Sequence, residues 1–354
     1  MNRGGIETWL MQVLRQPGAA VQYELLLLSF RVGDYEPELA ALGVRVHRCP
    51  PPNSPAFVRC VLDVLRRGHY DVVHSHVHHF SGAVLALARL SGVPGRLAHS
   101  HLDSRVLDRA ARWPRKLYLR LMTALIAAHA SEGVAVSDQA AAALFGPQWR
   151  RKPERRVVPL GIDPQPYTVP VDVQALRQSL DLPGEALVIG HVGWFRTQKN
   201  HAFLLRVFAE IWRRRPDARL LLVGGGELMD QVRLQALELG VLEAVVFAGS
   251  RSDVPALLRV MDVFVFPSLH EGLGLAVIEA QMVGLACVHT AGLPPESRLP
   301  GTDVTALPLD AGAPAWADAV LEAAGRSRQY PSAQPYDLAH STALFLERYD
   351  HYRR

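Results

Sequence analysis

A strand, a loop and a helix near residue 270 constrain the fold of this sequence more than any other stretch. A β-branched and aromatic run at 263–266 stops at Pro267. Apolar side chains with helical spacing then resume at Leu275, Ile278 and Met282. A strand joined through a short loop to a helix is the repeating unit of a parallel α/β sheet, so we expect this part of the chain to lie in such a sheet.

The loop and the first helical turns, 267–280, also carry chemistry. Glu271 precedes Gly272 and Gly274, and Glu279 follows Glu271 by eight positions. Glycines let the backbone come close to a ligand, and the free N–H groups at the start of the helix form an anion site. We expect a phosphate there, with Glu279 near hydroxyl groups of the same ligand and Glu271 near the reacting group. The competing interpretation is an ordinary connection with two solvated acids.

A second loop supplies positive charge. The apolar run at 186–192 predicts a strand, and the loop after it, 193–200, contains Arg196 and Lys199. A helix dipole contributes only about 0.3–2 kcal/mol, whereas micromolar binding needs about 8 kcal/mol, so a diphosphate needs further partners. The planar fork of arginine and the mobile ammonium of lysine suit a leaving diphosphate. The alternative is a pair of solvated cations in a loop.

The rest of the chain alternates strands and helices. Buried strands are predicted at 23–30, 44–49, 71–75, 96–100, 133–137 and 157–161 in the first half, and at 220–223, 245–248 and 286–289 in the second half, where the last of them closes the sheet. Helical spacing occurs between strands, for example at 56–67 and 83–90. This alternation favours parallel sheets with helices on both faces.

Length and turn residues indicate two domains. The 354 residues, 49% of them hydrophobic, suffice for two cores of ordinary size. The segment 159–170 is dense in proline and glycine and lacks helical periodicity, which predicts a hinge. A helix with an apolar stripe is predicted at 337–352.

The glutamate pair, its glycines and the strand before them resemble the E-x7-E motif of the retaining glycosyltransferases of family four, the group 1 enzymes of exopolysaccharide type. The resemblance implies the GT-B architecture, an α/β fold in which two Rossmann-like parallel-sheet domains face a cleft. It implies an acceptor-side domain at 1–165, a nucleotide-sugar-binding domain at 166–330 and a terminal helix at 331–354 that returns to the first domain.

The resemblance also implies roles for individual residues. Two cations, Arg196 and Lys199, stabilise the leaving diphosphate, Glu271 positions the sugar, and His101 orients a sugar hydroxyl or the acceptor. The residues implied to contact the nucleotide-sugar are Gly4, Gly5, Gly224, Ser250, Arg251, Gly272, Leu273, Gly274, Leu275 and Glu279. The glycine turn at 224–226 is expected to let the nucleotide pass close to the backbone; it is not a dinucleotide fingerprint, because Met229 stands where the third glycine belongs.

The function implied is that of a retaining, hexosyltransferase-type enzyme (EC 2.4). It would move a sugar from a nucleotide-sugar, expected to be UDP-linked, to a hydroxyl of a sugar or a lipid-linked glycan, in exopolysaccharide or cell-surface glycan synthesis. The family's mechanism needs no metal and no further cofactor.

Two other functions stay open. A UDP-sugar 2-epimerase shares the fold but needs several acids to move a proton, and Asp71 and Asp103 make a poor set near the strand ends. A non-catalytic nucleotide-sugar-binding scaffold is the third interpretation. Formation of the manno epimer from UDP-N-acetylglucosamine would identify the epimerase. The absence of any slow donor breakdown would identify the scaffold.

The amino end departs from the family pattern. Gly4 and Gly5 resemble a glycine loop that leads into a helix, but no strand precedes them, whereas family members have a strand there. Either the start was placed too far downstream, or the first sheet lacks a strand at its centre. In the second case we expect a less stable first domain.

Histidines are frequent in the first half. Six of them lie around the ends of two predicted strands: His74, His76, His78, His79, His99 and His101. A metal site is disfavoured here, because no carboxylate or cysteine gathers with them and the family needs no metal. The family pattern aligns its active-site histidine with His101 rather than with His99. The alternative role for His101 is a rim residue bonded to a backbone carbonyl.

Charge limits the partners of the chain. A net charge of +4 permits an anionic ligand without requiring nucleic acid, and no nucleic-acid-binding motif is present. Six basic residues recur through 105–120, and Leu107, Leu117, Leu121 and Leu125 are expected on the other side of that helix. This pattern is compatible with peripheral contact at an anionic membrane or with a merely solvated helix.

The cysteines and the hydropathy of the chain indicate the cellular compartment of the protein. Cys49, Cys60 and Cys287 are odd in number and scattered, which argues against a disulfide framework or a zinc site. No run approaches the roughly 18 apolar residues of a membrane span, and no leader opens the chain. We therefore expect a cytoplasmic protein that can be peripheral at the inner face of the membrane.

Overall fold

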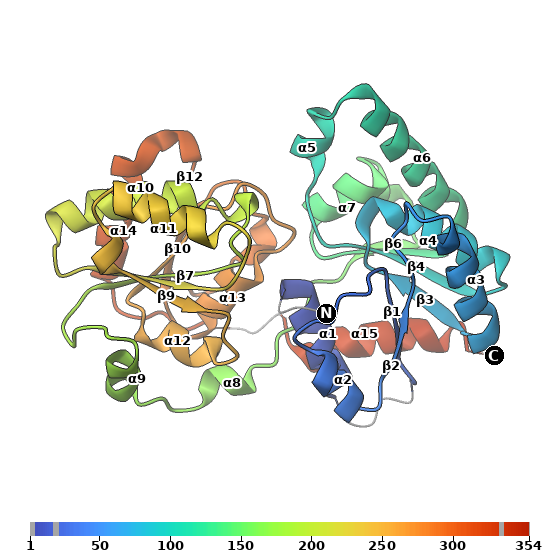
Figure 1. The fold of residues 1–354 in the computed structure, drawn as a ribbon, viewed down its shortest axis with the longest axis horizontal. Coiled ribbons are helices and arrows are strands. Elements are labelled where there is room, and N and C mark those ends of the chain that lie inside the picture. Colours follow the sequence, from blue (N-terminus) through green and yellow to red (C-terminus); the bar gives the residue numbers. More distant parts are fainter. Residues whose placement is uncertain (1–3, 17–20, 333–335, 354) are drawn as a thin grey trace. The chain divides into compact units, whose positions relative to one another are not determined.

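The computed structural model describes residues 4–16, 21–332 and 336–353, which form two compact units. The first unit comprises Met1–Asp163 with Tyr336–Arg354, and the second comprises Pro164–Pro335. The last helix, α15 (Leu338–Asp350), belongs to the first unit, where a parallel bridge joins Ile162 to Asp337 (Figure 1).

The second unit is built on a six-stranded parallel sheet with the order β12-β11-β10-β7-β8-β9. Its strands are β7 (Val188–Val192), β8 (Arg219–Val223), β9 (Val245–Gly249), β10 (Val263–Phe266), β11 (Ala286–Thr290) and β12 (Val304–Leu307). This is the doubly wound order, and it reverses direction between β7 and β10. The prediction that 286–289 closes the sheet is wrong, because β12 pairs with β11 as a short, half-exposed edge strand with little apolar signal.

Helices cover both faces of this sheet, as Figure 1 shows. The helices of this unit are α8 (Gln165–Thr168), α9 (Val173–Ser179), α10 (His201–Arg214), α11 (Met229–Glu238), α12 (Val254–Val260), α13 (Leu275–Met282) and α14 (Gly312–Ala324), of which α8 and α9 pack on α12. All four residues of β10 are fully buried. Burial on both faces explains its continuous apolar sequence, which is typical of a parallel sheet.

The first unit contains a four-stranded parallel sheet with the order β3-β4-β5-β6 and a separate parallel pair, β1-β2. Its strands are β1 (Glu24–Leu27), β2 (Arg45–Arg48), β3 (Val72–Ser75), β4 (Gly95–Ser100), β5 (Glu132–Ala135) and β6 (Arg155–Val157). Its other helices are α1 (Gly5–Leu14), α2 (Glu36–Ala41), α3 (Ala56–Gly68), α4 (Ser81–Leu90), α5 (Arg105–Arg109), α6 (Trp113–His129) and α7 (Asp138–Phe145).

The expected gap in the first sheet is present. Within the described ranges no pairing joins β1 to β3, and α1 is the element that comes before β1. Met1, Asn2 and Arg3, the start of the predicted glycine loop, lie outside the described residues. The strand predicted at 23–30 is shorter than expected: β1 has four half-buried residues, and the side chain of Phe30 is 62% exposed.

The expectation that the cysteines form no disulfide is wrong. Cys49 and Cys60 are bonded, with their Cα atoms 5.7 Å apart. Cys49 follows β2 and Cys60 lies in α3, so the return of the chain from strand to helix brings them together. An odd count of scattered cysteines does not show which strand ends and helices pack together. Cys287 is buried and free.

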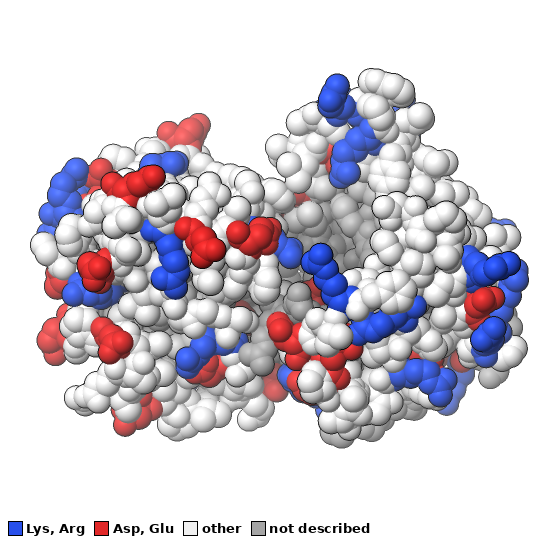
Figure 2. Space-filling view, in the orientation of Figure 1, with Lys and Arg blue, Asp and Glu red and all other residues white. Residues whose placement is uncertain are grey.

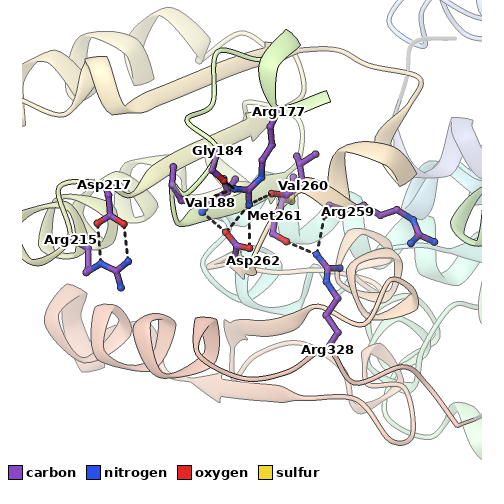
Figure 3. A network of polar contacts seen from close by, with 11 residues as sticks. Arg177, Gly184, Val188, Arg215, Asp217, Arg259, Val260, Met261, Asp262 and Arg328 are labelled. Carbon is purple, nitrogen blue, oxygen red and sulfur yellow. Dashed lines mark hydrogen bonds and ion pairs between the residues drawn. The ribbon is translucent and has the colours of Figure 1, made fainter. Parts of the chain in front are cut away.

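Two arginines close the amino-terminal edge of the second sheet (Figure 3). Arg177 donates to the carbonyl oxygens of Gly184, Ala186 and Val260 and to the carboxylate of Asp262. Arg328 donates to carbonyl oxygens of Val283, Arg259 and Met261. Asp262 also accepts the backbone N–H of Val188 at 2.7 Å. The strand starts and helix ends at this edge therefore have polar partners within the protein.

Candidate active site

Two loops meet at the carboxyl end of the second sheet. They are 193–200, which follows β7, and 267–274, which follows β10, the two strands between which the strand order reverses. Gln198 donates through Nε2 to the His270 carbonyl at 2.7 Å and accepts the Leu269 N–H at 2.8 Å. Asn200 donates through Nδ2 to the Pro267 carbonyl at 3.2 Å. Ligands of open α/β sheets bind at this kind of position.

Lys199 and Glu271 form the centre of the site. Lys199 Nζ lies 2.6 Å from Glu271 Oε1, and their side chains are 18% and 9% exposed. Ser268 Oγ donates to the same carboxylate oxygen at 2.5 Å. Nζ also lies 4.7 Å from the ring centroid of Phe266. The structure therefore holds an ammonium and a carboxylate side by side, with the strand end beneath them.

Glu279 lies on α13 and accepts a hydrogen bond from the Tyr167 hydroxyl at 2.8 Å. Burial raises the pKa of Glu279 to about 7, while the Tyr167 hydroxyl and the charge of Lys199 act in the opposite direction. The influence of Lys199 places Glu279 in the same electrostatic site as Glu271. At neutral pH its carboxyl group exchanges between the neutral and charged forms.

The start of α13 offers main-chain donors. Gly274 has a φ of +77° and precedes the helix, and no side chain caps that end. The first N–H groups of a helix have no partner inside it, so Leu275 and its successor present donors at the loop. Leu273 is buried, so its backbone rather than its side chain is suited to a ligand. Gly272 lies in the buried part of the same loop.

Arg196 stands apart from this group. Its side chain is 60% exposed, lies 3.8 Å from Glu227 Oε1, and stacks over Trp194 at 5.7 Å. Among the described residues Arg196 has no contact with Glu271 or Glu279. The structure thus brings together one of the two predicted cations and both predicted glutamates.

The glycine turn at 224–226 packs against the loop after β7. A Cβ on Gly224 would lie 2.1 Å from the Gly193 carbonyl oxygen, and one on Gly226 would lie 2.6 Å from the Phe195 backbone. Both glycines have positive φ, +143° and +148°. These contacts account for the glycines by the close approach of two backbones.

The remaining predicted nucleotide contacts follow β9. Arg251 forms a bidentate ion pair with Asp253, at 2.8 and 2.6 Å, and Ser250 is exposed. The side chain of Arg251 is therefore committed within its own turn, so the backbone of Ser250 and Arg251 is what this loop presents.

The first unit holds the other predicted site residues. His101 follows β4, and its Nε2 lies 2.8 Å from Nδ1 of His76. Burial, with smaller effects of His76 and His78, holds the pKa of His101 well below its ordinary range, so the ring is neutral at pH 7. Gly4 is extended at the start of α1, and Gly5 is the first residue of that helix.

Sequence reasoning missed four residues that shape the site: Tyr167, Gln198, Asn200 and Ser268. Gln198 and Asn200 flank Lys199, and Asn200 is left-handed with a φ of +56°. An asparagine before a helix is a detectable turn signal. Tyr167 gave no signal, because its contact with Glu279 spans 112 positions.

The chain matches known families over both of its halves. Residues 172–323 match the family described as glycosyl transferases group 1, and residues 4–161 match the glycosyl transferase 4-like domain. The EpsF protein of Bacillus subtilis, named as a glycosyltransferase, is 32% identical over 336 residues, 93% of this chain and 86% of EpsF.

A second relative is an Escherichia coli galactosyltransferase named for the acceptor α-D-GlcNAc-diphosphoundecaprenol. It is 27% identical, over 64% of this chain and 59% of its own length. Among solved structures, HepE of Anabaena, in complex with UDP and glucose, superposes with a TM-score of 0.80 at 20% identity, covering 98% of this chain and 96% of HepE. Sucrose-phosphate synthase of Thermosynechococcus elongatus has a TM-score of 0.75 at 21% identity, covering 98% and 93%. These likenesses show the GT-B fold.

Proposed function

The chain belongs to the group 1 glycosyl transferases, and from this premise we propose that it moves a sugar from a UDP-sugar to a hydroxyl acceptor with retention of anomeric configuration. The observation that supports this most is the Lys199–Glu271 contact of 2.6 Å between the loops after β7 and β10, beside the start of α13. A cation, main-chain donors and acids in one place match a diphosphate joined to two sugars.

Each part of the donor has a partner in this proposal. The diphosphate binds Lys199 and the N–H groups at the start of α13, and Arg196 adds a mobile charge at the exposed side. Glu271 binds a hydroxyl of the transferred sugar, and Glu279 binds the ribose. The ammonium of lysine has three donors, and Glu271 takes one of them, so the pair can receive a phosphate without separating.

The transfer exchanges one bond at the anomeric carbon. The bond from that carbon to the diphosphate oxygen breaks, and a bond to the acceptor oxygen forms on the same face. The acceptor proton passes to the departing diphosphate oxygen. Charge that develops on the diphosphate is balanced by Lys199 and the helix start, so the proposal places no metal in this step. Nε2 of His101 contacts His76, so Nδ1, which has no partner among the described residues, is the atom that we propose contacts a sugar hydroxyl or the acceptor.

The nature of the donor and acceptor follows from chemistry and from the relatives together. HepE was solved with UDP and glucose and also with UDP-glucose, which supports a uridine donor. The E. coli relative is named for a lipid-diphosphate acceptor, which supports a lipid-linked glycan. We place the activity in exopolysaccharide or cell-surface glycan synthesis.

Thermal shift and donor breakdown test this function. UDP-glucose, UDP-galactose and UDP-N-acetylglucosamine, compared with GDP-mannose, should raise the melting temperature of the chain by mass action. Lys199→Met should lose most of that shift, whereas Lys152→Met, an exposed lysine of the first unit, should keep it. If no UDP-sugar shifts the wild type, or if both variants behave alike, the donor site is refuted.

Product analysis separates the rival activities. Slow release of free sugar and UDP from the shifting donor, without acceptor, is expected of the transferase. The manno epimer from UDP-N-acetylglucosamine would instead establish an epimerase. Binding without any breakdown, also when polyprenyl-diphosphate glycan is supplied, would establish a scaffold.

Helices α5 and α6 present the surface that we assign to the membrane. In α6, Trp113, Leu117 and Leu121 lie four residues apart on one side and are 76%, 61% and 54% exposed. Leu117 and Leu121 were expected on the side of the helix away from the basic residues. Both side chains are exposed to solvent, and so are the neighbouring Lys116 and Arg120. Figure 2 shows basic side chains among uncharged ones over α5 and the start of α6.

An exposed apolar row flanked by cations is the pattern of a helix that lies in an anionic membrane surface. No helix in the described ranges is long and apolar enough to cross a membrane. Leu117→Glu with Leu121→Glu should weaken sedimentation with phosphatidylglycerol vesicles at least tenfold. Leu234→Glu with Leu237→Glu, two leucines of α11 that are similarly exposed, should not. Equal binding by both double variants would disprove this assignment.

A further inference from the structure

Four histidines of the first unit gather on one face of its sheet. His74 lies in β3 and His76 just after it; His99 lies in β4 and His101 just after it. The register pairs His74 with Leu97, so His76 falls opposite His99 on the same face. The ring centroids of His99 and His101 are 3.9 Å apart, and those of His74 and His76 are 4.3 Å apart.

The contacts of these rings orient them toward one another. The Tyr349 hydroxyl on α15 bonds to His74 Nδ1 at 2.6 Å, which leaves His74 Nε2 at 3.1 Å from His99 Nδ1. His101 Nε2 similarly holds His76 Nδ1 at 2.8 Å. Tyr349 and His101 each bond to one ring nitrogen of His74 and His76, as the outer partners of metal-binding histidines do.

Hydrogen bonding within the cluster leaves nitrogens without partners. Nε2 of His99 and Nδ1 of His101 are buried and have no partner among the described residues. Leaving such a group unsatisfied destabilises the fold, so a bound ion that engages the cluster is favoured.

Two helices cover the cluster with apolar rings. Trp9 of α1 lies 5.9 Å from His99 and 6.0 Å from His76, between ring centroids. Phe345 of α15 lies 5.4 Å from His74 and 5.5 Å from His99. Both covering side chains are buried. Imidazole nitrogens beside such apolar rings bind a late transition metal in preference to magnesium or calcium.

We propose that His74, His76 and His99 bind one divalent late transition metal ion, zinc first among them, which joins β3 to β4 and takes no part in sugar transfer. One ring nitrogen of each lies within 4.8 Å of the others. Tetrahedral zinc with bonds of about 2.0–2.1 Å needs nitrogens about 3.3 Å apart, so small side-chain rotations complete the site. β3 is the edge strand beside the gap in the sheet, where such a link stabilises most.

A second group of possible ligands in the described residues, His78, His79 and Asp108, is a weaker candidate. Asp108 Oδ2 accepts from Ser104 Oγ at 2.5 Å and pairs with His79 Nε2 at 3.1 Å. His78 Nε2 already lies 2.9 Å from Ser104 Oγ. These contacts engage Nε2 of both histidines and Oδ2 of the aspartate, although His78 Nδ1, His79 Nδ1 and Asp108 Oδ1 have no hydrogen-bond partner among the described residues. The absence of carboxylates and cysteines around His74 is no obstacle to a site of three nitrogens.

Metal titration of the full chain, prepared without an affinity tag and freed of metal by a chelator, tests the proposal. We expect one Zn²⁺ per chain by mass spectrometry, and a melting temperature that rises with Zn²⁺ and falls with chelator. His74→Gln and His99→Gln should weaken Zn²⁺ binding at least tenfold. His129→Gln, a single histidine at the end of α6, and His78→Gln should bind as the wild type does.

Failure of the wild type to bind stoichiometrically would overturn the site, as would unchanged binding by His74→Gln and His99→Gln. Loss of binding in His78→Gln alone would move the metal to the other group and equally refute the proposal. If the glutamine variants do not fold, Co²⁺ in the wild type decides. Visible absorption of a tetrahedral nitrogen site supports the proposal, and the pale spectrum of the aquated ion contradicts it.

Discussion

The two edges of the second sheet use cations in opposite ways. At the amino-terminal edge, Arg177 and Arg328 bond to six carbonyl oxygens between them, and Arg177 also pairs with Asp262 (Figure 3). At the carboxyl edge, Lys199 contacts Glu271, and Arg196 is largely exposed near Glu227. Both terminal nitrogens of Arg177 and of Arg328 bond to the protein, while Lys199 and Arg196 keep donors for a ligand.

The difference follows from what each edge exposes. Turns at the amino-terminal edge present carbonyl oxygens that need donors, so guanidinium groups there stabilise the fold. Glycine loops and helix starts at the carboxyl edge present N–H groups, so a cation adds to a positive field that an anion can enter. Substitutions at the carboxyl edge should therefore lower the transfer activity of the folded protein, and substitutions at the amino-terminal edge should not.

The largest effect is expected for Lys199→Met. Removing a cation aimed at the leaving diphosphate should lower kcat by about 10²–10³, or about 3–4 kcal/mol of transition-state stabilisation. Some stability should be lost as well, because Glu271 is buried and keeps Ser268 Oγ but not its cation. Steady-state transfer kinetics and thermal unfolding check both parts, and a loss of stability without a loss of kcat would break the comparison.

The next effect concerns stability. Arg177→Met removes several bonds at the amino-terminal edge and leaves Asp262 without this partner. Because Asp262 is partly exposed, we expect a loss of about 2–3 kcal/mol in the free energy of unfolding, below the roughly 3–5 kcal/mol of a fully buried pair. Urea denaturation measures it, with kcat of the folded fraction unchanged. Arg215→Met, which breaks an exposed pair with Asp217 at the same edge, should have no measurable effect on unfolding.

Glu279 should give a pH-dependent difference. Its pKa is about 7 in the folded chain against an ordinary value of 4.5, so between these values the folded state binds more protons than the unfolded state. Stability therefore falls as the pH rises from about 4.5 to 7, by about 1–3 kcal/mol. Glu279→Gln should lack this fall. Unfolding at several pH values, compared between wild type and variant, tests it, and parallel profiles would exclude the raised pKa.

The smallest effect is expected for Arg196→Met. An exposed cation screened by water contributes about 1 kcal/mol or less, so the KM for the donor should rise about fivefold or less, with a stability like that of the wild type. A kcat loss as large as that of Lys199→Met would show that Arg196 reorients onto the diphosphate when the donor binds.

Local patterns predicted much of the fold. The runs that became β3, β4, β7, β8, β9, β10 and β11 were found within two residues of their ends. The signal is strongest for β7, β8, β10 and β11, because they are buried along nearly their whole length and strands buried on both faces are apolar runs. β12 and the true length of β1 were not predicted, since short, half-exposed strands have no continuous apolar run. The disulfide was not predicted, because the spacing of Cys49 and Cys60 does not show that the helix packs beside the end of the strand.

The site was predicted as residue types in loops, and its contacts were not. Glu271 and Lys199 were recognised from glycines, acids and cations after strands. That Lys199 bonds Glu271 across 72 positions, while Arg196 does not reach it, depends on β7 lying beside β10. Gln198, Asn200 and Tyr167 entered the site for the same reason.

By itself the sequence determined where strands end, which loops contain glycine and which charges follow them, because backbone preference and hydrophobic period act over a few neighbouring residues. The tertiary structure alone decided which strand ends meet, which cation faces an acid, and that His74, His76 and His99 share one covered face. Those outcomes depend on strand order and helix packing, which join residues that are distant along the chain.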